Sequence, residues 1–172
     1  MVKRIFFIGL LALSLAASGF SQNYSQGGIQ FMIPTRDFST VVFQGVNLGV
    51  GFFGSNRYFL NDNVSLKADA GYTLLINDFG DIGGQVVDLM GGGEYCFRPE
   101  GYILRPYAGG TMGLTLVQGS AFFGLRPQVG VMVELGEFAL LDIGLGQQFM
   151  FGRFNLHGFT PKIGLIMNFN TF

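Results

Sequence analysis

The chain of 172 residues contains 28 glycines and 20 phenylalanines, and only 12% of its residues are charged, against 49% that are hydrophobic. A mean hydropathy of +0.42 with so little charge argues against disorder and against the surface of an ordinary soluble domain. Ten basic against eleven acidic residues leave no cationic surplus for nucleic acid, and the glycines lack the three-residue period of collagen.

The first segment, residues 1–21, is typical of an export signal. Lys3 and Arg4 precede an apolar run at 5–17, which is shorter than the roughly 20 residues of a membrane-spanning helix. We expect cleavage after Ser21, with Gly19 as the alternative site and an uncleaved anchor as the alternative interpretation. There is no cysteine near the cleavage site, so we do not expect a lipid-anchored lipoprotein. The remaining domain, 22–172, carries eight basic and eleven acidic residues, a net charge of −3.

Beyond residue 21 the apolar residues recur with a period of two. Val46, Leu48 and Val50, for example, alternate with polar or small residues. Such alternation predicts β-strands with one apolar and one polar face. The segments that show it are 25–33, 42–59, 64–76, 85–97, 103–117, 122–135, 139–151 and 159–172.

The connections between these segments alternate in length. Those at 60–63, 98–102 and 136–138 are tight, whereas those at 34–41, 77–84, 118–121 and 152–158 are mostly longer. Outer-membrane barrels have short periplasmic turns and longer outer loops. We therefore predict an all-β fold, an eight-stranded antiparallel up-and-down transmembrane β-barrel that closes and so has no free edge.

The charged side chains of the eight segments all fall on one face. They are Arg57, Lys67, Arg105, Arg126 and Lys162, with Asp69, Asp88, Glu94, Glu134 and Asp142. A basic residue facing lipid at the midplane costs roughly 2–4 kcal/mol, so this pattern predicts a barrel with its charges in the lumen. The alternative, a soluble β-sandwich, would spread more charge over its exposed positions.

The symmetry of the predicted hairpins indicates which lumenal charges meet. One expected belt is Lys67–Glu94–Arg105–Glu134, and a second expected group is Arg126, Gln148 and Lys162 near Asp88. A barrel of eight strands is narrow enough for side chains to fill its interior. We therefore expect paired charges that plug the lumen, with an ion pathway as the alternative.

Aromatic residues gather near the ends of the predicted strands, as the interfacial girdles of membrane barrels do. One group is Tyr58, Tyr95, Phe97 and Tyr102, and the other is Phe122, Phe123, Phe149, Phe151 and Phe159. We expect each group to mark one membrane surface.

Two stretches carry a family resemblance: GVGFFGSNRYFLNDNVSLKADAGY, with Gly51 to Tyr72 at its centre, and LRPYAGGTMG at 104–113. They resemble the small outer-membrane β-barrel family that includes the OmpA transmembrane domain and OmpX. The resemblance implies a bacterial outer-membrane location, with membrane lipid and the barrel-assembly machinery as partners. It also implies a C-terminal aromatic assembly signal, for which Phe169 and Phe172 are the candidates. In the predicted last strand, Phe169 falls on the lipid-facing side and Phe172 on the opposite side. An extracellular ligand is a further candidate partner, but the sequence does not identify it.

Residues that could carry chemistry are few. His157 shares a rim with Ser120, Asp78 and Asp81, but no His-x-Ser motif accompanies it. The lone Cys96 is expected to be a packed thiol, and the glycines at 91–93 lack the lysine of a phosphate loop. We therefore expect no enzyme, no cofactor and no metal site, but a structural or surface-interaction role. The alternatives are a narrow pore for ions or small solutes and, less favoured, a lipid-modifying enzyme.

Overall fold

The computed structural model describes residues 23–35, 45–61, 63–97, 103–136, 139–153 and 155–168. Its strands are β1 (Asn23–Pro34), β2 (Val46–Phe59), β3 (Val64–Asn77), β4 (Ile82–Cys96), β5 (Leu104–Val117), β6 (Ser120–Glu134), β7 (Ala139–Phe151) and β8 (Asn155–Asn168). The expected signal at 1–21 and the candidate assembly residues Phe169 and Phe172 lie outside the described residues. No helix within these ranges is long and apolar enough to cross a membrane.

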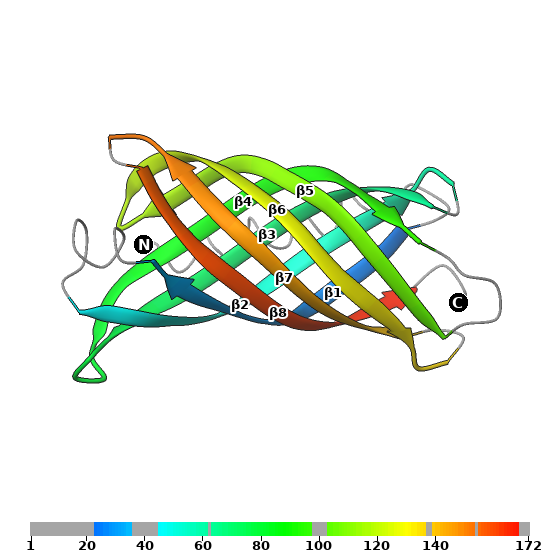
Figure 1. Ribbon diagram of the computed structural model, residues 1–172, viewed down its shortest axis with the longest axis horizontal. Helices are drawn as coiled ribbons and strands as arrows, with labels where there is room; N and C mark the ends of the chain where they lie inside the picture. Colours follow the sequence, from blue (N-terminus) through cyan, green and yellow to red (C-terminus); the bar gives the residue numbers. More distant parts are fainter. Residues whose placement is uncertain are drawn as a thin grey trace, which may run out of the picture.

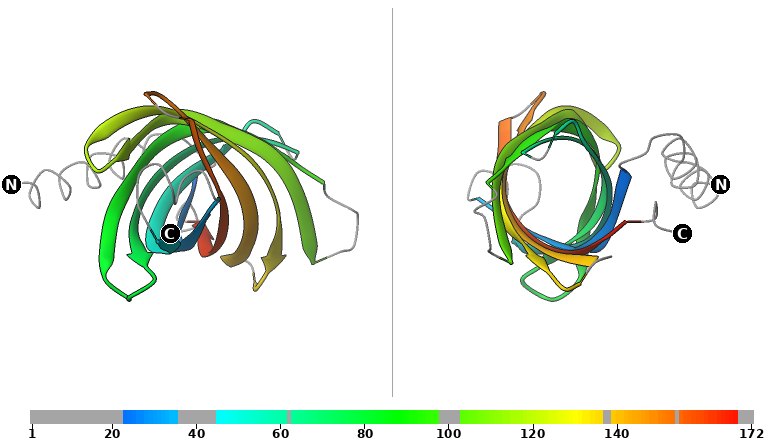
Figure 2. Two further views of the ribbon diagram at one scale, coloured as in Figure 1. Left: turned by 60° about the vertical axis from the view of Figure 1, so that its left-hand side comes forward. Right: turned by 90° about the vertical axis from the view of Figure 1, so that its right-hand side faces the viewer.

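The strands form one closed barrel in chain order, which confirms the predicted fold class. Every consecutive pair is antiparallel, and β1 also pairs with β8, so that Ile29 lies between Phe52 and Ile163. The strands run obliquely along the barrel (Figure 1), and the view along its length shows them as a ring (Figure 2). We call the end where β1 begins and β8 ends the terminal end, and the opposite end the distal end.

The predicted alternation of short and long connections is wrong. Of the connections at the distal end, 35–45 is long as predicted, but the others are short. There β3 and β4 are joined by residues 78–81, β5 and β6 by 118–119, and β7 and β8 by 152–154. Gln118 and Gly119 have φ of 49° and 83°, the positive values of a two-residue hairpin turn. The strands therefore extend into residues that the sequence pattern assigned to loops, such as Asn155 in β8.

Side chains alternate between the lumen and the outer surface. Phe52 and Leu66 point outward and are 70% and 49% exposed, whereas their inward neighbours Phe53 and Lys67 are buried. Val46 was expected on the outer, apolar face, but it is buried in the lumen. The reason is a register shift between Val46 and Leu48, which moves the first residue of β2 to the other face.

Two inward glycines show how a narrow lumen holds long side chains. A Cβ atom on Gly144 would lie 2.5 Å from the hydroxyl of Tyr107 and 2.7 Å from Cε of Lys162. A Cβ atom on Gly92 would collide with the backbone of the neighbouring strand, whereas its neighbours in the run 91–93 have more room. Glycine thus leaves the space that Tyr107 and Lys162 occupy, and in the run 91–93 only the central residue relieves crowding.

Candidate functional site: a polar layer in the lumen

A ring of buried apolar side chains lies at the distal end of the lumen. Each of the eight strands contributes one buried side chain: Met32, Val46, Leu75, Val86, Val117, Phe122, Met150 and Leu156. None of these side chains is more than 5% exposed. We call this set the distal ring.

A second apolar cluster lies at the terminal end. Its buried members are Cys96, Tyr107, Met132, Leu140 and Ile166, with Tyr24 and Phe59 packed against them. The rings of Tyr24 and Phe59 meet edge to face with centroids 5.2 Å apart. We call this set the terminal ring. Neither ring was predicted, although both consist of apolar residues at inward positions near strand ends, a signal that the sequence contains.

Between the two rings lies a layer of buried polar side chains. It holds eight of the ten charged residues expected in the lumen, none more than 6% exposed: Arg57, Lys67, Arg126 and Lys162, with Asp69, Asp88, Glu94 and Asp142. Four basic and four acidic groups give this layer a formal net charge of zero. Balanced charge is required here, because an uncompensated buried charge is strongly destabilising.

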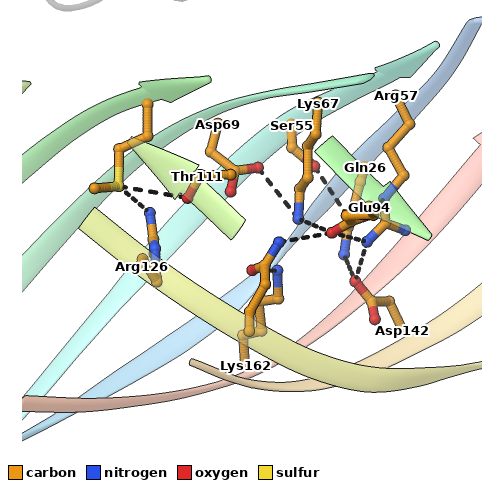
Figure 3. A network of polar contacts seen from close by, with 12 residues as sticks. Gln26, Ser55, Arg57, Lys67, Asp69, Glu94, Thr111, Arg126, Asp142 and Lys162 are labelled. Atoms are coloured by element: carbon orange, nitrogen blue, oxygen red, sulfur yellow. Dashed lines mark hydrogen bonds and ion pairs between the residues drawn. The ribbon is translucent and has the colours of Figure 1, made fainter. Parts of the chain in front are cut away.

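Glu94 is the most connected carboxylate of the layer (Figure 3). Its Oε2 lies 2.8 Å from Nε of Arg57, and its Oε1 lies 3.2 Å from Nζ of Lys67. The amide of Gln128 donates a third contact to Oε1, at 2.6 Å. Lys67 also reaches Asp69, at 3.4 Å. One carboxylate from β4 therefore joins cations from β2 and β3.

Asp142 is the second acceptor of Arg57. Its Oδ2 lies 3.0 Å from Nη2 of Arg57 and accepts a hydrogen bond of 2.6 Å from Gln26. The hydroxyl of Tyr107 donates to the other oxygen at 2.8 Å, and the Arg57 guanidinium stacks 5.3 Å from the centre of the Tyr107 ring. Arg57 is thus held by two carboxylates and an aromatic face, all of them buried.

The distal part of the layer is organised differently. Asp88 accepts hydrogen bonds from Thr115 at 2.7 Å and from Gln148 at 2.6 Å, both neutral donors. Nη2 of Arg126 lies 2.8 Å from the sulfur of Met90, a weak acceptor. No carboxylate of the described residues lies within ion-pair distance of Arg126, and Figure 3 shows its side chain apart from the carboxylates around Glu94.

The expected pairings are met in part. Lys67 pairs with Glu94, and Arg105 contacts Glu134 at the terminal rim, where their side chains are 23% and 35% exposed. Arg57, which was not assigned to the belt, is a principal cation partner of Glu94. In the second group Gln148 does reach Asp88, whereas Lys162 donates to Gln128 at 2.9 Å and lies over the ring of Phe53. Hairpin symmetry did not predict the contacts of Arg57 with Glu94 and of Lys162 with Gln128, because these residues lie on strands that are not neighbours in the barrel.

The other residues considered for chemistry do not converge. The ring of His157 stacks on Phe149 with centroids 6.3 Å apart. In the described part of the chain, no hydrogen bond joins that ring to Ser120, Asp78 or Asp81, and no three metal-ligating side chains gather at one place. Cys96 is buried in the terminal ring.

Aromatic side chains lie at both rims of the outer surface. Tyr58, Tyr95 and Phe97 are exposed at the terminal end, and Phe123, Phe151 and Phe159 are exposed at the distal end. Phe122 was expected among them, but it belongs to the distal ring, 5% exposed, because it has the opposite parity to Phe123. Tyr102 lies outside the described residues.

Solved structures of bacterial barrels resemble this one over most of the chain. Neisserial surface protein A matches with a TM-score of 0.64 at 18% identity, covering 86% of this chain and 97% of that one. The N-terminal β-barrel domain of Pseudomonas aeruginosa OprF matches with 0.54 at 17% identity, covering 86% and 98%. Ail, the attachment invasion locus protein of Yersinia pestis, matches with 0.51 at 15% identity, covering 86% and 99%.

No protein-family model matches the chain, and no curated protein sequence does. The chain has the fold of the small eight-stranded outer-membrane β-barrels, which confirms the resemblance inferred from the sequence. At these identities the likeness defines the fold, and the role has to be argued from the lumen and the outer surface.

Proposed function

We propose that this protein is a non-enzymatic outer-membrane barrel with a structural or surface-interaction role, and that its lumen is plugged. The observation that carries the proposal is the order of layers along the lumen: a distal apolar ring, a polar layer of zero net charge, and a terminal apolar ring. A chain of water or ions through the barrel would have to pass both rings.

The outer surface supports a lipid environment. Large apolar side chains from all eight strands face outward, among them Phe52, Met112 and Val129, which are 70%, 56% and 55% exposed. Aromatic side chains lie at both rims of this surface, as in membrane barrels. Export by the signal at 1–21 and insertion by the barrel-assembly machinery follow from this proposal.

The polar layer supports the plug on energetic grounds. Opening a path along the lumen would separate Arg57 from Glu94 and Asp142, and a buried ion pair that loses one partner is destabilised by about 3–5 kcal/mol. The distal ring presents Phe122 and Met150 as further obstacles. A narrow pore for ions or small solutes is the second candidate, favoured by the buried charges that would line its path.

A surface-interaction role depends on the distal connections. Phe79, in the connection 78–81, is 91% exposed, and the connection 35–45 is the longest at that end. The turn around Phe79 is built by Asn77, whose side-chain oxygen accepts hydrogen bonds from the backbone of Phe79 and Asp81. An ordered turn that presents an apolar tip is suited to contact with a partner or with lipid headgroups.

Single-channel recording in a planar bilayer tests the plug. The protein would be refolded in detergent and shown to be inserted by the shift of its gel mobility on boiling. The proposal predicts no discrete conductance steps from the unmodified barrel. Steps whose size changes in Arg57→Ala or Glu94→Ala would support the pore instead, since these side chains would then line the path.

A further inference from the structure

Three buried polar atoms near the distal ring have no hydrogen-bond partner among the described residues. They are Nε of Arg126, Oε1 of Gln148 and Oγ1 of Thr160. Their residues are 4%, 0% and 4% exposed. A buried polar group without a partner costs about 1–3 kcal/mol, so three of them in one place require an explanation.

Two of the three residues, Arg126 and Thr160, border one inward glycine, and the third lies two residues from that glycine on the same strand. A Cβ atom on Gly146 would lie 2.8 Å from Oγ1 of Thr160 and 3.0 Å from Cγ of Arg126. Gly146 pairs directly with Thr160 in the sheet, and Gln148 follows Gly146 by two residues on the same face of β7. The stem of Arg126 and the hydroxyl of Thr160 thus border the same small space above the backbone of Gly146.

The unmet groups are complementary in their chemistry. Nε of Arg126 can only donate, Oε1 of Gln148 can only accept, and the hydroxyl of Thr160 can do either. A halide could accept from Arg126 but could not donate to Gln148, and the amide oxygen would repel it. The set requires a small ligand that both donates and accepts.

A matching arrangement elsewhere in the layer shows what such a link does. There Lys162 donates to Oε1 of Gln128 at 2.9 Å, and the amide nitrogen of Gln128 donates to Glu94 at 2.6 Å. One glutamine thus joins a cation to a carboxylate with its amide oriented correctly for both. Gln148 makes the carboxylate half of the same arrangement with Asp88, at 2.6 Å.

We infer that Arg126, Gln148 and Thr160 form a binding site for one buried water molecule. This water accepts from Nε of Arg126, donates to Oε1 of Gln148 and exchanges a hydrogen bond with Thr160. It completes a chain from Arg126 through Gln148 to Asp88, and so it couples a cation and a carboxylate that form no ion pair within the described part of the chain. Buried waters with two to four such partners are common in protein interiors.

The test is nuclear magnetic resonance of the intact barrel refolded in deuterated detergent, observing the Nε–H groups of the arginines. The site predicts a cross-peak between water and Nε–H of Arg126, assigned by its loss in Arg126→Lys. Nε of Arg57 is the internal comparison: it lies 2.8 Å from a carboxylate oxygen of Glu94, so its cross-peak to water should be clearly weaker than that of Arg126. Absence of the Arg126 cross-peak in the unmodified protein would overturn the proposal.

A pair of matched variants localises the water. Thr160→Val should abolish or strongly weaken the cross-peak at Arg126, whereas Thr73→Val, at a buried threonine that accepts from Gln30, should leave it unchanged. Equal loss in both variants would contradict the site.

An anion titration tests whether the ligand is water. Bromide added at constant ionic strength should not move the Arg126 resonance, and a saturable shift would mean that the site binds an anion instead of water. The result is independent of the plug, since a conducting barrel could hold the same water.

Discussion

The terminal and distal halves of the polar layer use the same residue types with opposite results. On the terminal side Arg57 contacts two carboxylates and a tyrosine ring, while on the distal side Arg126 contacts a thioether. Both arginines are buried, and both occupy inward positions on their strands. The alternation of side chains along a strand therefore determines that a charged side chain points into the lumen. The stagger of neighbouring strands determines whether it meets an opposite charge there.

Substitution of Arg57 should give the largest effect and establish the terminal half as the ion-paired one. Arg57→Met leaves Glu94 and Asp142 buried with fewer cations, so we expect a loss of about 3–5 kcal/mol in the free energy of unfolding. The measurement is urea unfolding of the barrel in lipid vesicles. A loss as small as that of a rim substitution would mean that Arg57 is not held by these contacts.

The distal half should depend on its apolar ring instead. Phe122→Ala removes a side chain that is 5% exposed and should cost about 3–5 kcal/mol in the same assay. The control is Phe123→Ala, its neighbour, which faces outward and is 52% exposed. Equal losses from the two substitutions would show that the distal ring is not packed as described.

Substitution of Arg126 sharpens the contrast with Arg57. Arg126→Met removes a cation without a direct carboxylate contact and keeps an apolar side chain beside Met90, so the expected loss is at most about 2 kcal/mol. A loss equal to that of Arg57→Met, in parallel unfolding curves, would mean that the two halves are equally dependent on ion pairs.

The smallest effect is expected at the rim. Glu134 contacts Arg105, but the two side chains are 35% and 23% exposed, so Glu134→Gln should cost only about 0–1 kcal/mol. The matched change Glu94→Gln, at a fully buried glutamate, should cost several times more in the same unfolding experiment. Equal losses of unfolding free energy at the two glutamates would contradict the idea that burial sets the strength of their ion pairs.

The barrel itself could be predicted from the sequence. The apolar side chains of the period-two strands have to face lipid and the charged ones have to face the interior, and a closed barrel meets both conditions. The buried positions of Arg57, Lys67 and Glu94 follow from that parity. The position of Val46 did not, because a local register shift reverses the parity at the start of β2. The two-residue turn at Gln118 was likewise hidden, since its length is set by backbone conformation.

Partners across the lumen were the least predictable part. Arg57 and Asp142 lie 85 residues apart and meet only because β2 and β7 face each other across a closed ring. Hairpin symmetry relates neighbouring strands, so it could identify Lys67 with Glu94 but not Arg57 with Asp142. The apolar rings could have been found by reading inward residues near strand ends, as Phe122 and Ile166 show.

Chemical access to the middle of the lumen is the most direct test of the proposal that the interior is closed. Ser55 is 4% exposed within the polar layer, and Ser120 is exposed at the start of β6, so both can be changed to cysteine with little change in size. In a Cys96→Ala background, each variant would be inserted into vesicles and treated with a small cationic thiol reagent. The plugged barrel predicts that Ser55→Cys stays unmodified while Ser120→Cys reacts to completion. Equal labelling of the two would show that water and ions enter the lumen.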